Sequence, residues 1–156
     1  MPKITKDDIA GPKGLGFIRE MFGAICPDEA AFELFITGII ADQALELEGR
    51  IGTTAYNDLA TPNAIYVKKA ERCLVAAEMI QRRINVLLGN AAGAGQELDT
   101  SNEHKQRQAY LDQVFGNLKA SPPVIGLIEK IVTGSSADGQ DFASGALVTG
   151  HFGETN

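Results

Sequence analysis

The chain has 156 residues, 44% of them hydrophobic and 22% charged, as in a folded globular protein. Its formal net charge is −6, and no dense run of lysine or arginine offsets it. This argues against nucleic acid as a primary ligand, because basic side chains supply most nonspecific affinity for DNA or RNA. The length fits one domain, and a core without tryptophan, built from aliphatic side chains and a few phenylalanines, suits packed helices.

The cysteine content and the N-terminus indicate a reducing compartment. Cys26 and Cys73 lie far apart with no histidine beside them, so we expect neither a disulfide framework nor a zinc site. The first residues lack the apolar core of a secretory signal, which predicts that the protein stays in the cytoplasm where it is made. No segment approaches the ~20 apolar residues of a membrane-spanning helix, so we expect no membrane contact.

The N-terminal third predicts a mixed segment followed by a long helix. Glycines and a proline interrupt residues 1–26, where we expect an arm with about two helical turns. Pro27, Asp28 and Glu29 are typical of a helix start, and Gly49 and Gly52 of its end. The apolar residues between them recur at intervals of three and four: Phe32, Phe35, Ile36, Ile39, Ile40, Leu47 and Ile51.

A loop and a second helix are expected next. Residues 53–60 are interpreted as a loop that folds back through Tyr56 and Leu59. Thr61 and Pro62 provide a capping hydroxyl and a first-turn proline, and Gly89-Asn90 is the expected stop. The apolar stripe of this helix comprises Ala70, Cys73, Leu74, Ala77, Ile80, Ile84, Leu87 and Leu88.

The remaining helices follow a glycine-rich connector at residues 89–98. Thr100 to Glu103 match a capping box, which predicts a third helix ending near residues 119–121, before two prolines. Its apolar side comprises Tyr110, Leu111, Val114, Phe115 and Leu118. The segment 124–132 could be a helix or a buried strand, and we favour the helix because Glu129 and Lys130 interrupt the apolar run at helical phase.

From residue 134 the composition changes to Gly, Ser, Thr and Asp. We therefore predict an all-α domain over residues 1–133, a small bundle of three to four helices with an extended N-terminal segment, and an extended C-terminal arm over 134–156. The isolated apolar residues of the arm are Phe142, Leu147, Val148 and Phe152.

No pattern in the chain predicts catalysis, a cofactor or a metal ion. The pair Gly14 and Gly16 is followed by Arg19 where a dinucleotide fingerprint needs glycine, and the 89–95 stretch lacks the Lys-Ser/Thr of a P-loop. His104 and His151 belong to no metal-binding spacing. The carboxylates fall on expected surface faces, four residues from a basic group in Glu46-Arg50 and Glu78-Arg82, so we interpret them as surface ion pairs.

Several segments together resemble the head-to-tail adaptor (connector) proteins of tailed bacteriophages. They are Leu47-Glu48-Gly49-Arg50-Ile51, the loop with Tyr56, Thr61 to Ala70, and Arg107 to Leu111, within residues 28–120. The resemblance implies a virion structural protein of the neck, made in the host cytoplasm, that forms a homo-oligomeric ring of about twelve subunits under the capsid portal. It implies portal and tail or neck proteins as partners, and a channel through which DNA passes without sequence-specific binding. The arm from Gly134 to Asn156 would then contact the portal through Phe142, Leu147, Val148 and Phe152.

Two other functions stay open from the residues alone. A helical interaction or regulatory module in the cytoplasm would bind another protein through a groove between its helices. A small hydrolase or transferase would require a paired acid and base beside one pocket.

Overall fold

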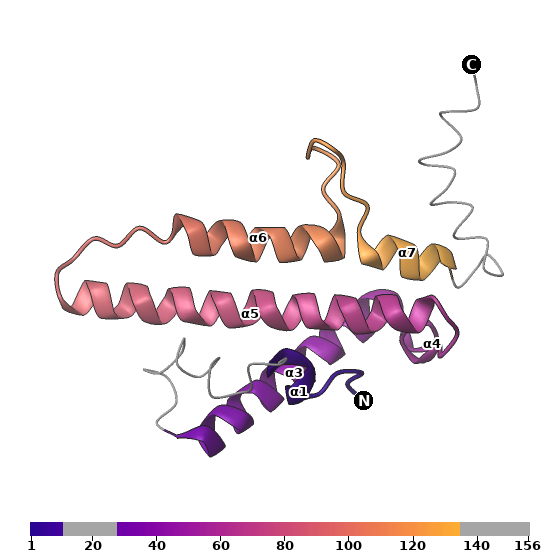
Figure 1. Cartoon of the computed structure of the whole chain (residues 1–156), viewed down its shortest axis with the longest axis horizontal. Helices are drawn as coiled ribbons and strands as arrows, with labels where there is room; N and C mark the ends of the chain where they lie inside the picture. Colours follow the sequence, from indigo (N-terminus) through magenta and orange to yellow (C-terminus); the bar gives the residue numbers. More distant parts are fainter. Residues whose placement is uncertain (11–27, 135–156) are drawn as a thin grey trace.

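The computed structural model describes residues 1–10 and 28–134, and the elements within these ranges are α-helices apart from one isolated β-bridge. The all-α prediction is therefore confirmed (Figure 1). The helices are α1 (Lys6–Ala10), α3 (Glu29–Ile51), α4 (Thr53–Asn57), α5 (Asn63–Gly93), α6 (Ser101–Phe115) and α7 (Leu127–Gly134).

The longest helix, α5, is the centre of the bundle and contacts all five of the other described helices. The helix α3 crosses one side of α5 obliquely, whereas α6 and α7 run along the other side (Figure 1). The described fold is thus a helical bundle with α5 between two sets of helices.

The helix α3 begins in the predicted region, but two residues later than expected, since Glu29 and not Pro27 is its first residue. Asp28 is its N-cap, and the carboxylate accepts a hydrogen bond from the Ala31 backbone N–H at 2.7 Å. The helix continues through Gly49 and ends at Ile51, because Gly52 adopts a φ of 85° that a helix cannot contain. Its inward face is the predicted one, except that Phe35 is only half-buried and Ala44 is also buried.

The predicted loop at residues 53–60 is partly wrong, because its first half is the helix α4. Tyr56 is fully buried, as expected, but Leu59 is 80% exposed. The Asn63 side chain donates to the Ala55 carbonyl at 2.8 Å and fastens the end of α4 to the start of α5. Leu59 lies in the short connection between these helices and does not reach the core.

Both predicted ends of α5 need correction. Pro62, not Thr61, occupies the N-cap, and no side chain caps the helix there. The helix also continues beyond Gly89 to Gly93. It stops where Gly95 adopts a φ of 66° and the Gly95 and Gln96 N–H groups bond to the carbonyls of Ala92 and Ala91, a Schellman motif.

The predicted stripe of α5 is buried over its first half, but Ile80 and Leu87 are only half-buried and Leu88 is 42% exposed. A second buried face was not predicted. It contains Val67, Glu71, Val75 and Met79. The helix is buried on two sides because α3 and α6 cover opposite sides of it (Figure 1).

The helix α6 is shorter and more exposed than predicted. Thr100 occupies the N-cap without a side-chain cap bond, so the predicted capping box is wrong, and the Asp99 carboxylate instead accepts the Ser101 N–H at 2.9 Å. The helix ends at Phe115, and the chain then turns through a bridge between Asn117 and Val124. Of the predicted apolar side, only Val114 is fully buried, and Leu118 is 79% exposed.

The turn after α6 depends on two glycines. Gly116 has a φ of 82°, and a Cβ atom at Gly126 would lie 2.5 Å from the carbonyl carbon of Phe115. This close approach brings α7 beside α6. The helix expected within residues 124–132 is confirmed from Leu127 onward, with Leu127 and Ile131 in the core.

Within the described residues, the core contains two clusters along α5. One joins the second half of α3, α4, the start of α5 and α7, around Leu47, Tyr56 and Ile131. The other joins the first half of α3 to the middle of α5 and includes Ile4 from the N-terminal segment. The first residues of the chain are therefore part of the packed bundle.

Candidate functional site

The predicted partner-binding residues of the arm, Phe142, Leu147, Val148 and Phe152, lie outside the described residues, as do His151 and Cys26. His104 is exposed at the start of α6. The described residues therefore do not test these positions, and the proposed roles of the arm residues stay predictions.

The carboxylates singled out from the sequence do form surface ion pairs. Glu46 and Arg50 are 2.9 Å apart, and Glu78 and Arg82 are 2.8 Å apart. Cys73 is buried in the first core cluster, where burial raises the pKa of its thiol. This environment fits its position in the predicted apolar stripe, since burial in apolar surroundings holds a thiol in the protonated, unreactive form.

Glu71, which the sequence analysis did not single out, is the most unusual ionisable group in the described residues. Its side chain is fully buried at 0% exposure in the middle of α5. Within residues 1–10 and 28–134, no salt bridge reaches it. A buried carboxyl without a cation requires hydrogen-bond donors, because transfer of the charged form out of water is costly.

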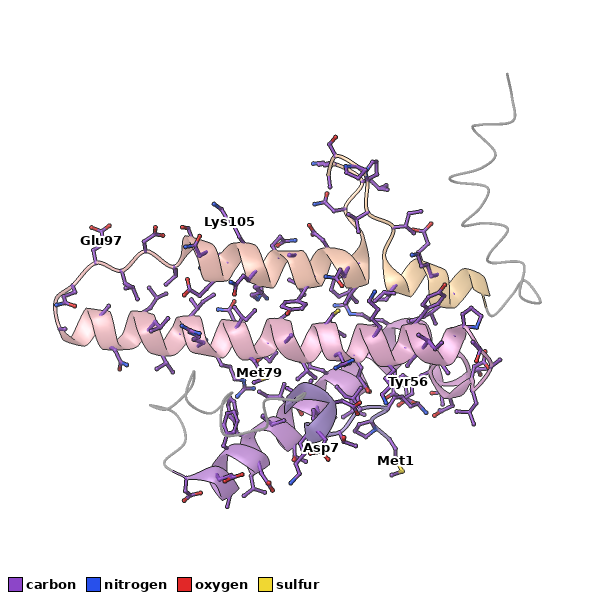
Figure 2. All side chains as sticks on the ribbon, in the orientation of Figure 1. Met1, Asp7, Tyr56, Met79, Glu97 and Lys105 are labelled. Carbon is purple, nitrogen blue, oxygen red and sulfur yellow. The ribbon has the colours of Figure 1, made fainter. Side chains whose placement is uncertain are left out.

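The donors come from the N-terminal segment and from α4. One carboxyl oxygen, Oε2, accepts the backbone N–H groups of Lys3 at 2.8 Å and Ile4 at 2.9 Å. The other, Oε1, is hydrogen-bonded to the Tyr56 hydroxyl. That hydroxyl also lies 3.1 Å from the Met1 carbonyl oxygen. Tyr56 and Met1 lie on the same side of α5 (Figure 2).

The proton count at Tyr56 indicates the charge state of Glu71. A phenol has one proton, yet both neighbours of the hydroxyl are acceptors when the carboxyl is ionised. Each of the three groups has a hydrogen-bond partner when the Glu71 carboxyl is protonated. It then donates to the Tyr56 hydroxyl, and that hydroxyl donates to the Met1 carbonyl oxygen. Burial raises the pKa of Glu71, which favours this protonated form, whereas the N–H groups of Lys3 and Ile4 and the nearby Lys3 ammonium oppose the rise. A hydrogen bond donated by Tyr56 to an ionised Glu71 would oppose the rise too. Burial and Glu71 also raise the pKa of Tyr56 above its usual range.

Further contacts fix the same segment to the bundle. The Lys3 ammonium donates to Asn57 Oδ1 at 2.9 Å and lies 4.8 Å from the Tyr56 ring centre. Lys6 pairs with Glu33 of α3 at 2.5 Å. The segment therefore connects α3, α4 and α5, and the Glu71 network acts as a structural latch. Tyr56 and Glu71 are both at 0% exposure, so a substrate has no access to them in this conformation.

One sequence signal for the buried carboxyl exists. Val67, Glu71, Val75 and Met79 follow each other at intervals of four, so Glu71 interrupts an apolar row of α5. The row lies beside the predicted apolar stripe of α5, so the periodicity of that stripe does not include Glu71.

The second feature is an open groove of about 820 Å³ between α1, α5 and α6. Its apolar lining includes Ile9, Met79, Ile80, Ala109 and Tyr110. Its charged lining comprises Asp8, Lys69 and Arg72. Asp8 pairs with Lys68 at 3.2 Å, and the Arg72 guanidinium donates to the Asp8 carbonyl oxygen at 2.7 Å. The exposed rim is therefore mainly basic.

No three His, Cys, Asp or Glu side chains in the described ranges gather as a metal site would require. Likewise, none of the described helices is long and apolar enough to cross a membrane. Comparison of the chain with protein-family models, curated proteins and solved structures gave no match.

Proposed function

We propose that the protein is a virion structural protein, a head-to-tail adaptor that forms a ring under the capsid portal and joins it to the tail. It works through shape and subunit contact, without chemistry. The resemblance at residues 28–120 suggested this function, and one feature of the fold supports it.

That feature is the end of the bundle from which the arm starts. The helix α7 ends at Gly134, where the arm sequence begins, and it packs against the first part of α5, with the Lys130 ammonium 5.9 Å from the Tyr66 ring centre. Near this end of α5, two large apolar side chains are exposed, Leu59 at 80% in the preceding connection and Ile65 at 58% in the helix. Exposed apolar side chains near the start of a Gly- and Ser-rich segment suit a surface that a protein partner covers.

The arm and this end therefore face the portal, and Phe142, Leu147, Val148 and Phe152 are the proposed anchors. The test uses the full chain and a variant truncated after residue 134, each mixed with a portal ring purified from the same source. The full chain should co-elute with the portal in fixed stoichiometry. The truncated chain should keep its far-UV circular dichroism and melting temperature but should no longer bind the portal.

If the full chain does not bind the portal at high concentration, the adaptor function is wrong. If truncation unfolds the protein, the arm belongs to the core and is not a docking element.

The alternative function is a helical module that recognises another protein. The groove between α1, α5 and α6 favours it, since an apolar floor with a charged rim fits an amphipathic segment. This function predicts a monomer or a dimer, whereas the adaptor assembles into larger rings.

A further inference from the structure

The outward face of α3 carries a row of small and apolar residues. Leu34, Gly38, Ala41, Leu45 and Gly49 follow at intervals of three and four and are all exposed, Leu34 at 76% and Leu45 at 69%. We call this row the α3 ridge. It lies opposite the buried face that contacts α5.

The α3 ridge is shaped for close contact. A Cβ atom added at Gly38 or Gly49 would meet nothing within 4 Å, so another surface can approach the backbone there. Leu34 and Leu45 project from the helix on either side of the small residues Gly38 and Ala41.

The α3 ridge is acidic. The helix carries five carboxylates and one arginine, which gives a net charge of −4. Asp42 and Glu48 border the ridge on its two sides. Another copy of α3 would therefore be repelled, and a partner surface needs basic groups around an apolar centre.

The groove between α1, α5 and α6 has these properties. It is concave and apolar, and its two basic lining residues, Lys69 and Arg72, outnumber its single carboxylate, Asp8, which also pairs with Lys68 outside the groove. Lys69 and Arg72 are exposed at its edge. A knob-bearing acidic ridge and a basic-rimmed apolar groove thus occur on different faces of the same chain.

We propose that the α3 ridge of one copy packs into the groove of the next copy, with Asp42 facing Lys69 or Arg72. The contact is heterologous, because it joins two different surfaces, and such contacts generate a ring when the rotation closes. This inference rests on the proposed function, for which it names the subunit interface.

Two variants test it, each altering one side of the contact at an exposed helical position. Leu45→Glu adds a charge to the ridge, and Ala109→Glu adds an acid to the groove wall on α6. Mass is measured by light scattering at increasing concentration. Each substitution should raise the dissociation constant for self-association at least about a hundredfold, so that each variant alone is monomeric. This is expected when a charge is buried against an apolar or like-charged surface.

Mixing the variants gives the decisive result. An intact groove on the Leu45→Glu chain can still accept the intact ridge of the Ala109→Glu chain, so the mixture should form one-to-one dimers and nothing larger. Leu118→Glu, at a leucine that is 79% exposed in the turn after α6, and Gln108→Glu, exposed on α6, are the matched controls and should assemble like the unaltered chain.

Any of three results would overturn the ridge-in-groove contact. The unaltered chain is monomeric, the two variants assemble like the unaltered chain, or their mixture stays monomeric. Failure of this contact is separable from failure of the adaptor function. An unaltered chain that forms rings or is captured by the portal, while both variants behave as it does, disproves the interface alone.

Discussion

Replacing Glu71 by glutamine should leave the protein as stable at pH 7 as the original chain, or more stable. Glutamine has the shape of a protonated glutamate, so its oxygen can accept the Lys3 and Ile4 N–H groups and its amide can donate to Tyr56. The free energy of unfolding should change by less than about 0.5 kcal/mol or increase. Glu71→Ala should cost about 3 kcal/mol, since it leaves two backbone donors unpaired and opens a cavity.

The pH dependence follows from the direction of the pKa shift. Burial holds the pKa of Glu71 above its usual value of 4.5 in the folded state. Its contribution to stability is therefore fully present below about pH 4.5 and is lost as the pH rises through the folded-state pKa. The stability of the original chain should thus fall relative to Glu71→Gln with rising pH, by at most about 1.4 kcal/mol per pH unit.

The assay is urea unfolding followed by circular dichroism at several pH values between 5 and 8, with the difference between the two chains plotted against pH. The lowered pKa values of Asp8, Asp99 and Asp112 work in the opposite direction, because their stabilisation is lost in acid, but they cancel in the difference. A loss of more than about 2 kcal/mol in Glu71→Gln at pH 7 would show that Glu71 is ionised and would refute the reasoning.

Substitutions at four other positions test the fold, each by chemical unfolding. Tyr56→Phe removes the hydroxyl between Glu71 and Met1 and should lower the free energy of unfolding by about 1–3 kcal/mol. The loss should be much smaller when Glu71 is already replaced by alanine. Equal losses in both backgrounds would show that the two side chains are not coupled. Gly126→Ala should strongly destabilise the protein, because its Cβ would lie 2.5 Å from the backbone of Phe115. Gly89→Ala, in open space on α5, should stabilise it by up to about 1 kcal/mol. A stabilising Gly126→Ala and a destabilising Gly89→Ala would contradict the described turn. Asp28→Ala should lower the free energy of unfolding by about 1 kcal/mol, because it removes the N-cap of α3. Asp28→Asn should keep most of the stabilisation, because asparagine can also cap the helix.

Helix positions were predictable where a local signal and the tertiary packing agree. Pro27, Asp28 and Glu29 precede an apolar periodicity, and α3 begins there, although Asp28 is its N-cap and not a residue of its first turn as expected. The end of α5 was not predictable in this way. A glycine inside a helix costs only about 1 kcal/mol, so Gly89 is tolerated, and the helix stops where Gly95 supplies a positive φ.

The extent of burial was harder to predict than helix type. The helix α6 has an apolar side in sequence, but Gly116 turns the chain at its end and leaves Phe115 at 43% exposure and Leu118 at 79%. Conversely, Glu71 is buried because the residues before α1 and the helix α4 cover one side of α5, through contacts 15 to 68 residues apart in sequence. Periodicity within one helix contains no information about such distant partners.

The most direct test of the central claim is the mass of the full chain in solution, alone and with a portal ring from the same source. A single chain has a mass of 16.6 kDa. The adaptor function predicts multimers well above a dimer, or stoichiometric capture by the portal. A 16.6 kDa species that stays monomeric at high concentration and ignores the portal would contradict it and favour the regulatory module.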